Sequence, residues 1–132
     1  MPVYIAGTQG HVFVCLHGAG HSAMSFAMVA AQLKASSTVV AFDWRGHGTH
    51  FTDLEGVTAQ DWYDDAEAAL LDLAQEVDQV VVVGLSMGGL VSLNLGIRHP
   101  DKIAGIVTWA AAMRFRDPLA PVAPMLSKLI KT

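Results

Sequence analysis

The sequence predicts an α/β fold in which a mostly parallel sheet is flanked by helices. Short apolar segments rich in β-branched residues alternate along the chain with longer segments of helical periodicity. Strands that alternate with helices pair in parallel, because each helix crosses back over the sheet. The chain has 132 residues, which is enough for one domain but not for two. We therefore expect a single domain over residues 1–132 with the element order β-β-α-β-α-β-α-β.

The chain is expected to begin with two strands, at residues 2–6 and 11–16. The short GTQG link between them favours an antiparallel hairpin. A glycine-bearing loop follows at 17–22, and Ser22 is placed to cap a helix that runs to about residue 35. Three apolar residues would form the inner face of this helix: Met24, Met28 and Leu33.

The middle of the chain carries the clearest helix signal. Residues 38–43 have the composition of a strand, and a polar, glycine-rich loop follows them. Thr58 and Asp61 then fit the Ser/Thr-x-x-Asp/Glu pattern that caps helices. Apolar residues recur after this cap at helical spacing, and acidic residues occupy the opposite face. The apolar set is Trp62, Ala66, Ala69, Leu70, Leu73 and Val77, and the acidic set is Asp64, Asp65, Glu67, Asp72 and Glu76.

The last two strands are expected at 79–84 and 103–110, which are continuous apolar runs. Such runs are typical of strands buried on both faces. The segment 86–98 between them is apolar nearly all round, which predicts a buried helix, and Pro100 ends it. The remainder has three prolines and a short amphipathic stretch at 125–130.

Composition excludes several classes of function. The chain has 8 basic and 12 acidic residues, a net charge of −4, and no basic stripe, which argues against a nucleic-acid partner. No apolar run approaches the roughly 18 residues of a membrane span, and no basic residue precedes the first apolar stretch as in a signal peptide. A single cysteine, Cys15, excludes an intrachain disulfide and a cysteine-cluster metal site. We expect a soluble, cytoplasmic protein without a membrane span.

The balance of apolar and charged residues also predicts a partner. Apolar residues make up 52% of the chain and charged residues 15%, against about 25% charged in an ordinary soluble domain. Exposed apolar area usually contacts something. The chain is therefore expected to pair with another chain or to form part of something larger.

Polar, glycine-bearing loops follow three of the expected strands, at 17–22, 44–57 and 84–89. In an open α/β sheet these loops meet at one edge, where ligands bind. The third loop contains Gly84-Leu85-Ser86-Met87-Gly88, a G-x-S-x-G sequence between a strand and a helix. In that context the serine hydroxyl projects from a sharp turn, and the Met87 N–H points at the oxyanion of a tetrahedral intermediate. A phosphate loop is disfavoured, because the Lys-Ser/Thr ending is absent.

Glycines surround this serine in the sequence. Gly84 and Gly88 would let the flanking backbone pass closely, since they carry no side chain. The segment His17-Gly18-Ala19-Gly20 follows the second strand and suits a second oxyanion donor, for which the Ala19 N–H is the best candidate.

Together, His17-Gly18-Ala19-Gly20, the DWRGHG after the next strand and GLSMGG resemble the α/β-hydrolase superfamily. Their order and spacing are most similar to its carboxylesterase and monoacylglycerol-lipase-like members. The resemblance covers residues 11–118 and corresponds to the N-terminal half of that fold, so it implies a truncated version. It implies a serine ester hydrolase that forms an acyl-enzyme on Ser86, with the Met87 and Ala19 amides as oxyanion hole. It also implies a small acyl-ester substrate, no cofactor, and a neighbouring loop shaped by Gly46, His47 and Gly48.

The family's acid and base follow the serine on strands beyond a cap region, and this chain stops where that cap would begin. After Ser86 the candidates are Asp101, Asp117 and His99, and the turn at 99–102 lies on the wrong edge of the sheet. Four earlier histidines fall on loops at the expected active edge, with two acids near them: His17, His21, His47 and His50, and Asp43 and Asp53. Of these, His21 and His47 are the base candidates least constrained by the motifs. We expect no metal site.

Two classes of function remain open from the sequence. The first is the ester hydrolase, with an acyltransferase or a C–C bond hydrolase as variants on the same scaffold. The second is a catalytically silent binding or assembly module that retains the serine turn. The family's strand order also implies that the strand at 103–110 would form an exposed sheet edge. The chain could then be a fragment, or a homodimer or a complementing chain could cover this edge, and of these we favour a homodimer.

Overall fold

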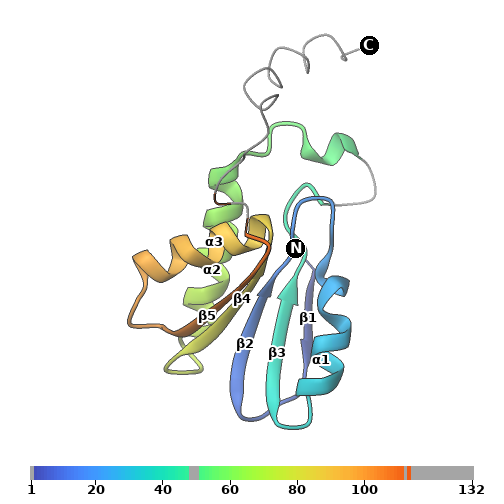
Figure 1. Cartoon of the computed structure of the whole chain (residues 1–132). Helices are drawn as coiled ribbons and strands as arrows, with labels where there is room; N and C mark the ends of the chain where they lie inside the picture. The colour runs from blue at the N-terminus through green and yellow to red at the C-terminus, as the bar shows by residue number, and fades with distance from the viewer. Residues whose placement is uncertain (1, 48–50, 112, 114–132) are drawn as a thin grey trace.

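The computed structural model describes residues 2–47, 51–111 and 113. His50, Gly48, Asp117 and the expected amphipathic stretch at 125–130 lie outside these residues. The described strands form one sheet in the order β1-β3-β2-β4-β5 (Figure 1). They are β1 (Val3–Ala6), β2 (His11–Leu16), β3 (Ser37–Phe42), β4 (Val80–Leu85) and β5 (Ile103–Trp109).

The sheet is mostly parallel, as the sequence predicted. β2 pairs in parallel with both β3 and β4, and β4 pairs in parallel with β5. Only β1 is antiparallel, to β3. This topology brings the carboxyl ends of β2, β3, β4 and β5 to one edge of the sheet.

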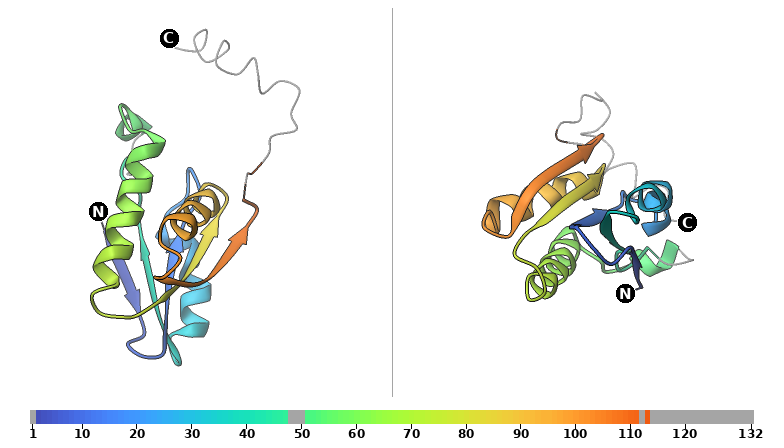
Figure 2. Two further views of the ribbon diagram at one scale, coloured as in Figure 1. Left: turned by 90° about the vertical axis from the view of Figure 1, so that its left-hand side faces the viewer. Right: turned by 90° about the horizontal axis from the view of Figure 1, so that it is seen from below.

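Helices cover both faces of the sheet (Figure 2). The 3₁₀ turn η1 (Ala23–Phe26) and helix α1 (Ala27–Leu33) lie on one face, against β2 and β3. Helices α2 (Ala59–Leu73) and α3 (Met87–Arg98) lie on the other, and a second 3₁₀ turn, η2 (Phe51–Leu54), lies in the loop before α2. Alternate strand residues accordingly divide between two cores: Val12, Val14 and Val82 pack toward α2 and α3, and Cys15, Val39 and Val83 toward η1 and α1.

The expected hairpin between the first two strands is wrong. β1 pairs with β3, with Val3 opposite Phe42 and Ala6 opposite Val39, and β2 lies on the far side of β3. The link between β1 and β2 therefore crosses the start of β3 instead of reversing in place. Gly10 permits this crossing, because its φ is +67° and a Cβ atom there would lie 3.0 Å from the Ser36 carbonyl carbon.

The first helix also differs from the sequence prediction. It starts as η1 and continues as α1, and the Ser22 side chain makes no capping hydrogen bond. Asp43, at the end of β3, accepts a hydrogen bond from the Ala23 N–H at 2.7 Å instead. The 3₁₀ turn shifts the helical register, so Phe26 is buried while Met24 and Met28 are 63% and 76% exposed. Leu33 does pack against the core, as expected.

Helix α2 follows its sequence pattern closely. Thr58 and Asp61 form a reciprocal capping box, and Ala66 and Leu70 are buried. The other apolar residues of the predicted stripe, Trp62, Ala69, Leu73 and Val77, pack against the same core.

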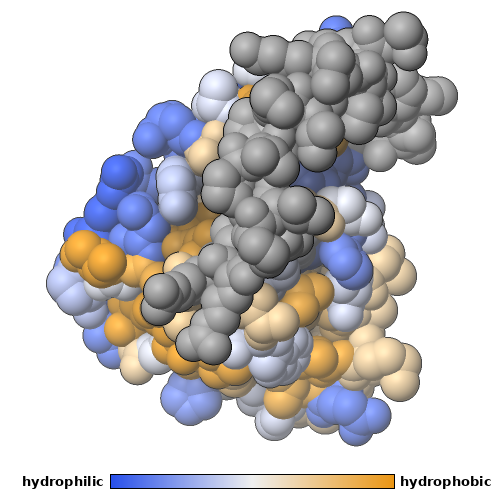
Figure 3. Space-filling view, turned by 45° about the horizontal axis from the view of Figure 1, so that its top comes forward, coloured by the Kyte–Doolittle hydropathy of each residue, from blue (hydrophilic) through white to orange (hydrophobic). Residues whose placement is uncertain are grey.

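Two elements expected to be buried are partly exposed. Val91 and Leu95 of α3 are buried, but Ile97 at its end is 81% exposed. β5 pairs only with β4 in the described sheet, and Val107 and Trp109 are 41% and 42% exposed. Hydrophobic residues accordingly reach the surface over a broad part of one face (Figure 3). Among the described residues, no helix is long and apolar enough to cross a membrane.

Candidate active site

Ser86 lies at the turn between β4 and α3 in a strained backbone conformation. Its φ is +51° and its ψ is −111°, in the left-handed half of φ space that residues with a side chain rarely adopt. The Ser86 N–H donates to the Trp109 carbonyl at 2.8 Å, and the Ser86 carbonyl accepts from the Gly89 N–H at 3.0 Å. Such strain costs about 1–3 kcal/mol and concentrates at functional sites. The side chain is half-buried at the sheet edge.

Close packing around Ser86 requires the glycines that flank it. A Cβ atom at Gly88 would overlap the Leu16 carbonyl oxygen and lie 2.8 Å from the His17 carbonyl oxygen. At Gly84 a Cβ atom would overlap the Gly88 carbonyl, which accepts a 2.7 Å hydrogen bond from the Ser92 hydroxyl. The first turn of α3 therefore lies directly against the end of β2. Met87 is the first residue of α3, so its N–H has no acceptor within the helix.

The loop after β2 lies beside Ser86. A Cβ atom at Gly18 would lie 3.2 Å from the Ser86 Cβ and 3.6 Å from His21 Cδ2, so His21 and Ser86 flank the same space. The His21 N–H donates to the Gly18 carbonyl at 3.2 Å, and Gly20 completes this turn with a φ of +72°. Ala19 is exposed at the tip of the turn. The His21 ring is exposed, with Nδ1 3.4 Å from the Ser25 hydroxyl.

His17 is fully buried and joins two loops of the site. Its Nδ1 lies 2.8 Å from the Gly18 carbonyl, and its Nε2 lies 3.2 Å from the Trp44 N–H. A carbonyl can only accept and an amide N–H can only donate, so the ring is neutral with its proton on Nδ1. The His17 carbonyl in turn accepts from the Trp44 indole N–H at 2.8 Å. Both ring nitrogens are therefore engaged, which leaves His17 unable to act as base or metal ligand in this arrangement.

Burial lowers the pKa of His17 below its ordinary value of 6.5, chiefly through desolvation. The hydrogen bond to Gly18 and the carboxylate of Asp43, whose Oδ1 is 3.8 Å from Nε2, oppose this lowering. The charges of His47 and His21 add to it. The unfolded chain therefore binds a proton at His17 at a higher pH than the folded chain does.

A pH dependence of stability follows from His17. Because the unfolded state takes up the proton first, stability should fall as the pH falls from about 6.5 toward the lower folded pKa. The urea unfolding midpoint, measured from pH 8 to pH 5, should show this loss in the wild type. The loss should shrink in His17→Asn and persist in His11→Asn, which changes an exposed histidine at the start of β2. An unchanged pH slope in His17→Asn would contradict the assignment.

Ion pairs and a hydrogen bond connect the loop after β3 to α2. Arg45 forms an ion pair with Asp61 at 3.2 Å and a two-pronged pair with Asp65. Its carbonyl accepts from the Trp62 indole N–H at 3.1 Å. This connection was not predicted from the sequence, although two aspartates four residues apart on a helix mark a face that can bind one arginine.

His47 lies in the same loop with its ring packed edge-on between two others. The ring centroids of His17 and Trp62 lie 5.1 Å and 5.6 Å from that of His47. Its Nδ1 is buried and has no hydrogen-bond partner among the described residues. Its neighbour Gly46 has a φ of +77°, and Asp53 lies next to that glycine, in η2. His47 therefore contacts both the buried His17 and α2 through its ring.

The histidine and acid that follow Ser86 lie away from it. His99 ends α3 and pairs with Glu67 of α2 at 2.7 Å, and Asp101 is exposed in the next turn. Both precede β5, whereas Ser86 contacts its far end. Among the described residues, no group of three or more histidine, cysteine or acidic side chains is arranged to hold a metal ion.

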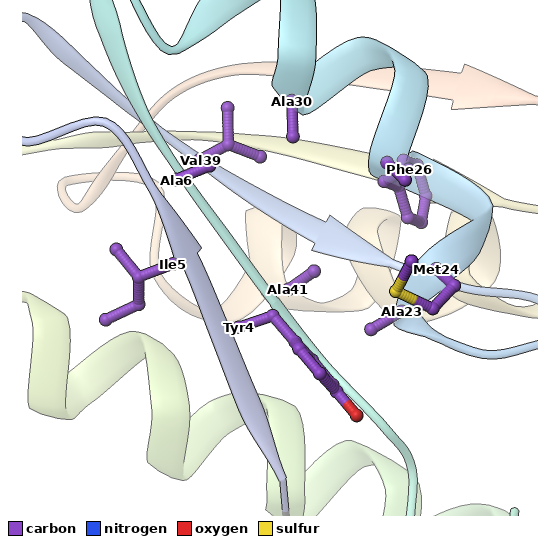
Figure 4. A pocket seen from close by; sticks show the side chains of 10 residues that line it. Tyr4, Ile5, Ala6, Ala23, Met24, Phe26, Ala30, Val39 and Ala41 are labelled. Carbon is purple, nitrogen blue, oxygen red and sulfur yellow. The ribbon is translucent and has the colours of Figure 1, made fainter.

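An apolar hollow of about 80 Å³ lies between β1 and the η1–α1 segment (Figure 4). Phe26, Met24 and Ile5 are among the residues that line it. Tyr4 also lines it, and its hydroxyl donates to Asp43 Oδ2 at 3.4 Å. This hollow is on the β1 side of the sheet, and Ser86 is not among its lining residues.

A serine on a strained strand-to-helix turn, beside two glycine loops, is an arrangement found in α/β hydrolases. Residues 13–131 match the model of the Alpha/beta hydrolase family, and the chain belongs to that family.

Its relatives include esterases and lipases. The thermostable monoacylglycerol lipase of Bacillus sp. (strain H-257) is 43% identical over 83 residues, which are 63% of this chain and 33% of the lipase. Methylesterase 7 of Arabidopsis thaliana is 35% identical over 121 residues, 90% of this chain and 46% of that protein. A structure from work on LipS and LipT, two metagenome-derived lipolytic enzymes, has a TM-score of 0.81 and 29% identity, and the match covers 91% of this chain and 49% of that one. The chain thus spans a third to a half of the length of these relatives.

Proposed function

We propose that this protein is a serine ester hydrolase that acts through an acyl-enzyme on Ser86. The carrying observation is the strained backbone of Ser86, which places a serine at the N-terminus of α3 beside the loop that follows β2. The identity to a lipase and a methylesterase supports the ester class. Small acyl esters are the proposed substrates.

In the proposed reaction, the Ser86 oxygen attacks the acyl carbonyl carbon and gives its proton to a base. The N–H groups of Met87 and Ala19 hold the resulting oxyanion, a contribution of about 3–4 kcal/mol per donor in comparable sites. The tetrahedral intermediate then expels the alcohol, which takes up the proton, and leaves the acyl group on Ser86. Water attacks this ester next, releases the acid and restores the serine.

The base in this scheme must come within hydrogen-bond reach of the Ser86 hydroxyl. Of the described histidines that we considered as bases, His17 has both nitrogens engaged, His47 is packed between rings, and His99 is paired with Glu67. His21 flanks the space beside Ser86 and is exposed, so we propose it as the base candidate within this part of the chain. The acid and a further base would otherwise come from the part of the relatives' fold that residues 1–132 do not match.

A fluorophosphonate probe tests the nucleophile. Wild type should become labelled on Ser86, as read by mass spectrometry of the digested protein, and Ser86→Ala should remain unlabelled. Ser36→Ala, which removes an exposed hydroxyl next to β3, should label like the wild type. Equal labelling of wild type and Ser86→Ala would overturn the proposal.

A second candidate function is a catalytically silent binding or assembly module. The engagement of both ring nitrogens of His17 favours it, because this engagement removes one of the candidate bases. A serine without a base in reach is a poor nucleophile. Hydrolysis of a short-chain p-nitrophenyl ester by the wild type, lost in Ser86→Ala, would exclude this candidate.

We also propose that a second chain, in the simplest case a second copy, pairs along the edge of β5 that no described strand covers. The exposed apolar side chain of Val107 supports this, since a bare apolar edge strand is prone to pairing. Light scattering of the purified chain should give twice the monomer mass, and a monomer at all concentrations would contradict the pairing.

A further inference from the structure

Trp109 joins the strand at the sheet edge to the candidate nucleophile. It is the last residue of β5, opposite Leu85 in the register, and its carbonyl accepts the Ser86 N–H at 2.8 Å. Its side chain is 42% exposed, although it is the largest apolar side chain of the strand. A large apolar ring is therefore held open to solvent on the residue that hydrogen-bonds Ser86.

Phe26 fixes the position of this indole from the other side. The two rings stack with centroids 6.0 Å apart and planes 22° apart. Phe26 is 1% exposed and belongs to η1, which begins directly after the loop that contains Ala19. The indole thus lies between the end of β5 and the element that follows the proposed oxyanion loop. Because the Trp109 indole is already stacked on Phe26, it loses little conformational entropy when a ligand binds, which favours contact with an apolar ligand.

The chain around Trp109 offers apolar contacts and no charge. Residues 103–111 contain no charged side chain. Val107 lies two residues earlier on the same face of β5 and is 41% exposed. Leu85, opposite Trp109, is half-buried. An aliphatic chain is the ligand chemistry that such a surface favours.

We propose that Trp109 is a specificity-determining residue whose indole, backed by Phe26, binds the aliphatic chain of the acyl group. The identity of the reacting carbonyl rests on the proposed function of Ser86, whereas binding of the chain requires no reaction. Longer acyl groups gain more from this contact than short ones, because each methylene that reaches the ring adds buried apolar area.

Equilibrium binding of butanoate, hexanoate and octanoate, measured by calorimetry, tests this inference. In the wild type, octanoate should bind more than about tenfold tighter than butanoate, from four additional methylenes. Trp109→Ala should weaken octanoate binding by about tenfold and leave butanoate unchanged. Trp109→Phe should retain most of the chain-length preference. Ile97→Ala removes a more exposed side chain from the end of α3 and should bind like the wild type.

Two outcomes would overturn the assignment of Trp109: equal octanoate binding by wild type and Trp109→Ala, or no gain from butanoate to octanoate in the wild type. Ser86→Ala separates this inference from the proposed function. If Ser86→Ala and the wild type bind octanoate alike, and binding depends on Trp109, the inference holds even where the fluorophosphonate probe fails to label Ser86. If the probe labels Ser86 and Trp109→Ala binds octanoate as tightly as the wild type, the proposed function is supported and this inference is wrong.

Discussion

Replacing Gly88 with alanine is expected to destabilise the fold by about 4 kcal/mol or more, a large part of the roughly 5–15 kcal/mol that stabilises an ordinary domain. A Cβ atom there would overlap the Leu16 carbonyl oxygen and lie 2.6 Å from the Leu16 carbonyl carbon. These are backbone atoms at the end of β2, which cannot rotate away, so α3 would have to move off the sheet. Helix propensity alone favours alanine over glycine by about 1 kcal/mol. The sign of the change in the free energy of unfolding, measured with urea, therefore shows whether the steric overlap or the helix propensity dominates.

Gly96 provides the matched control in the same helix. A Cβ atom at Gly96 would meet only the end of the flexible Ile106 side chain. That methyl group can turn aside, so Gly96→Ala should remain within about 1 kcal/mol of the wild type. Comparable losses in Gly88→Ala and Gly96→Ala would mean that contact with β2 is not the cause.

Local sequence signals predicted the elements whose causes are themselves local. Thr58 and Asp61 are three residues apart, and the capping box that they form needs nothing else to define the start of α2. The apolar run at 79–84 predicted a strand buried on both faces, and the structure confirms it in β4. The same prediction for 103–110 is wrong, because β5 lies at the end of the described sheet. The element order and the mostly parallel pairing followed from the alternation of strands and helices.

The wrong predictions concern partners that are distant in the sequence. A four-residue link is typical of a hairpin, but β1 pairs with β3, and β2 lies between two parallel neighbours. Ser22 is adjacent to the first helix, yet Asp43, 20 residues away from Ala23, accepts the N–H group at its start. No local pattern contains these contacts, because they depend on which strands become neighbours.

The candidate site also combines features that the local sequence predicts with contacts between residues distant in the sequence. The G-x-S-x-G sequence predicted a sharp turn at Ser86, and its φ of +51° shows one. The hydrogen bonds between His17 and Trp44 join two loops, and the ion pairs of Arg45 join one of these loops to α2, so both depend on the folded arrangement. The identity of the general base stays a prediction for the same reason, since it depends on which imidazole approaches Ser86 in the complete fold.

Replacing Trp44 with alanine is expected to cost about 4 kcal/mol, because it empties a large buried site and removes a link between two loops. Trp44 is 2% exposed and packs edge-on against Phe42, with ring centroids 5.1 Å apart. Its indole N–H and its backbone N–H both donate to His17. The alanine variant keeps only the backbone bond, so the His17 carbonyl loses its buried partner. Chemical denaturation of the purified variant gives the free energy of unfolding.

Trp44→Phe separates packing from the hydrogen bond. Phenylalanine retains most of the apolar contact and loses only the indole N–H, so the cost should be about 1–2 kcal/mol. Trp62→Phe is the matched control: it also loses an indole N–H bond, to the Arg45 carbonyl, but at a half-buried side chain where water can replace it. The control should therefore cost less than Trp44→Phe. If the two phenylalanine variants lose equal stability, the buried bond to His17 stabilises the fold no more than the half-buried bond to Arg45 does. The position of the loop that contains Ala19 must then depend on packing alone.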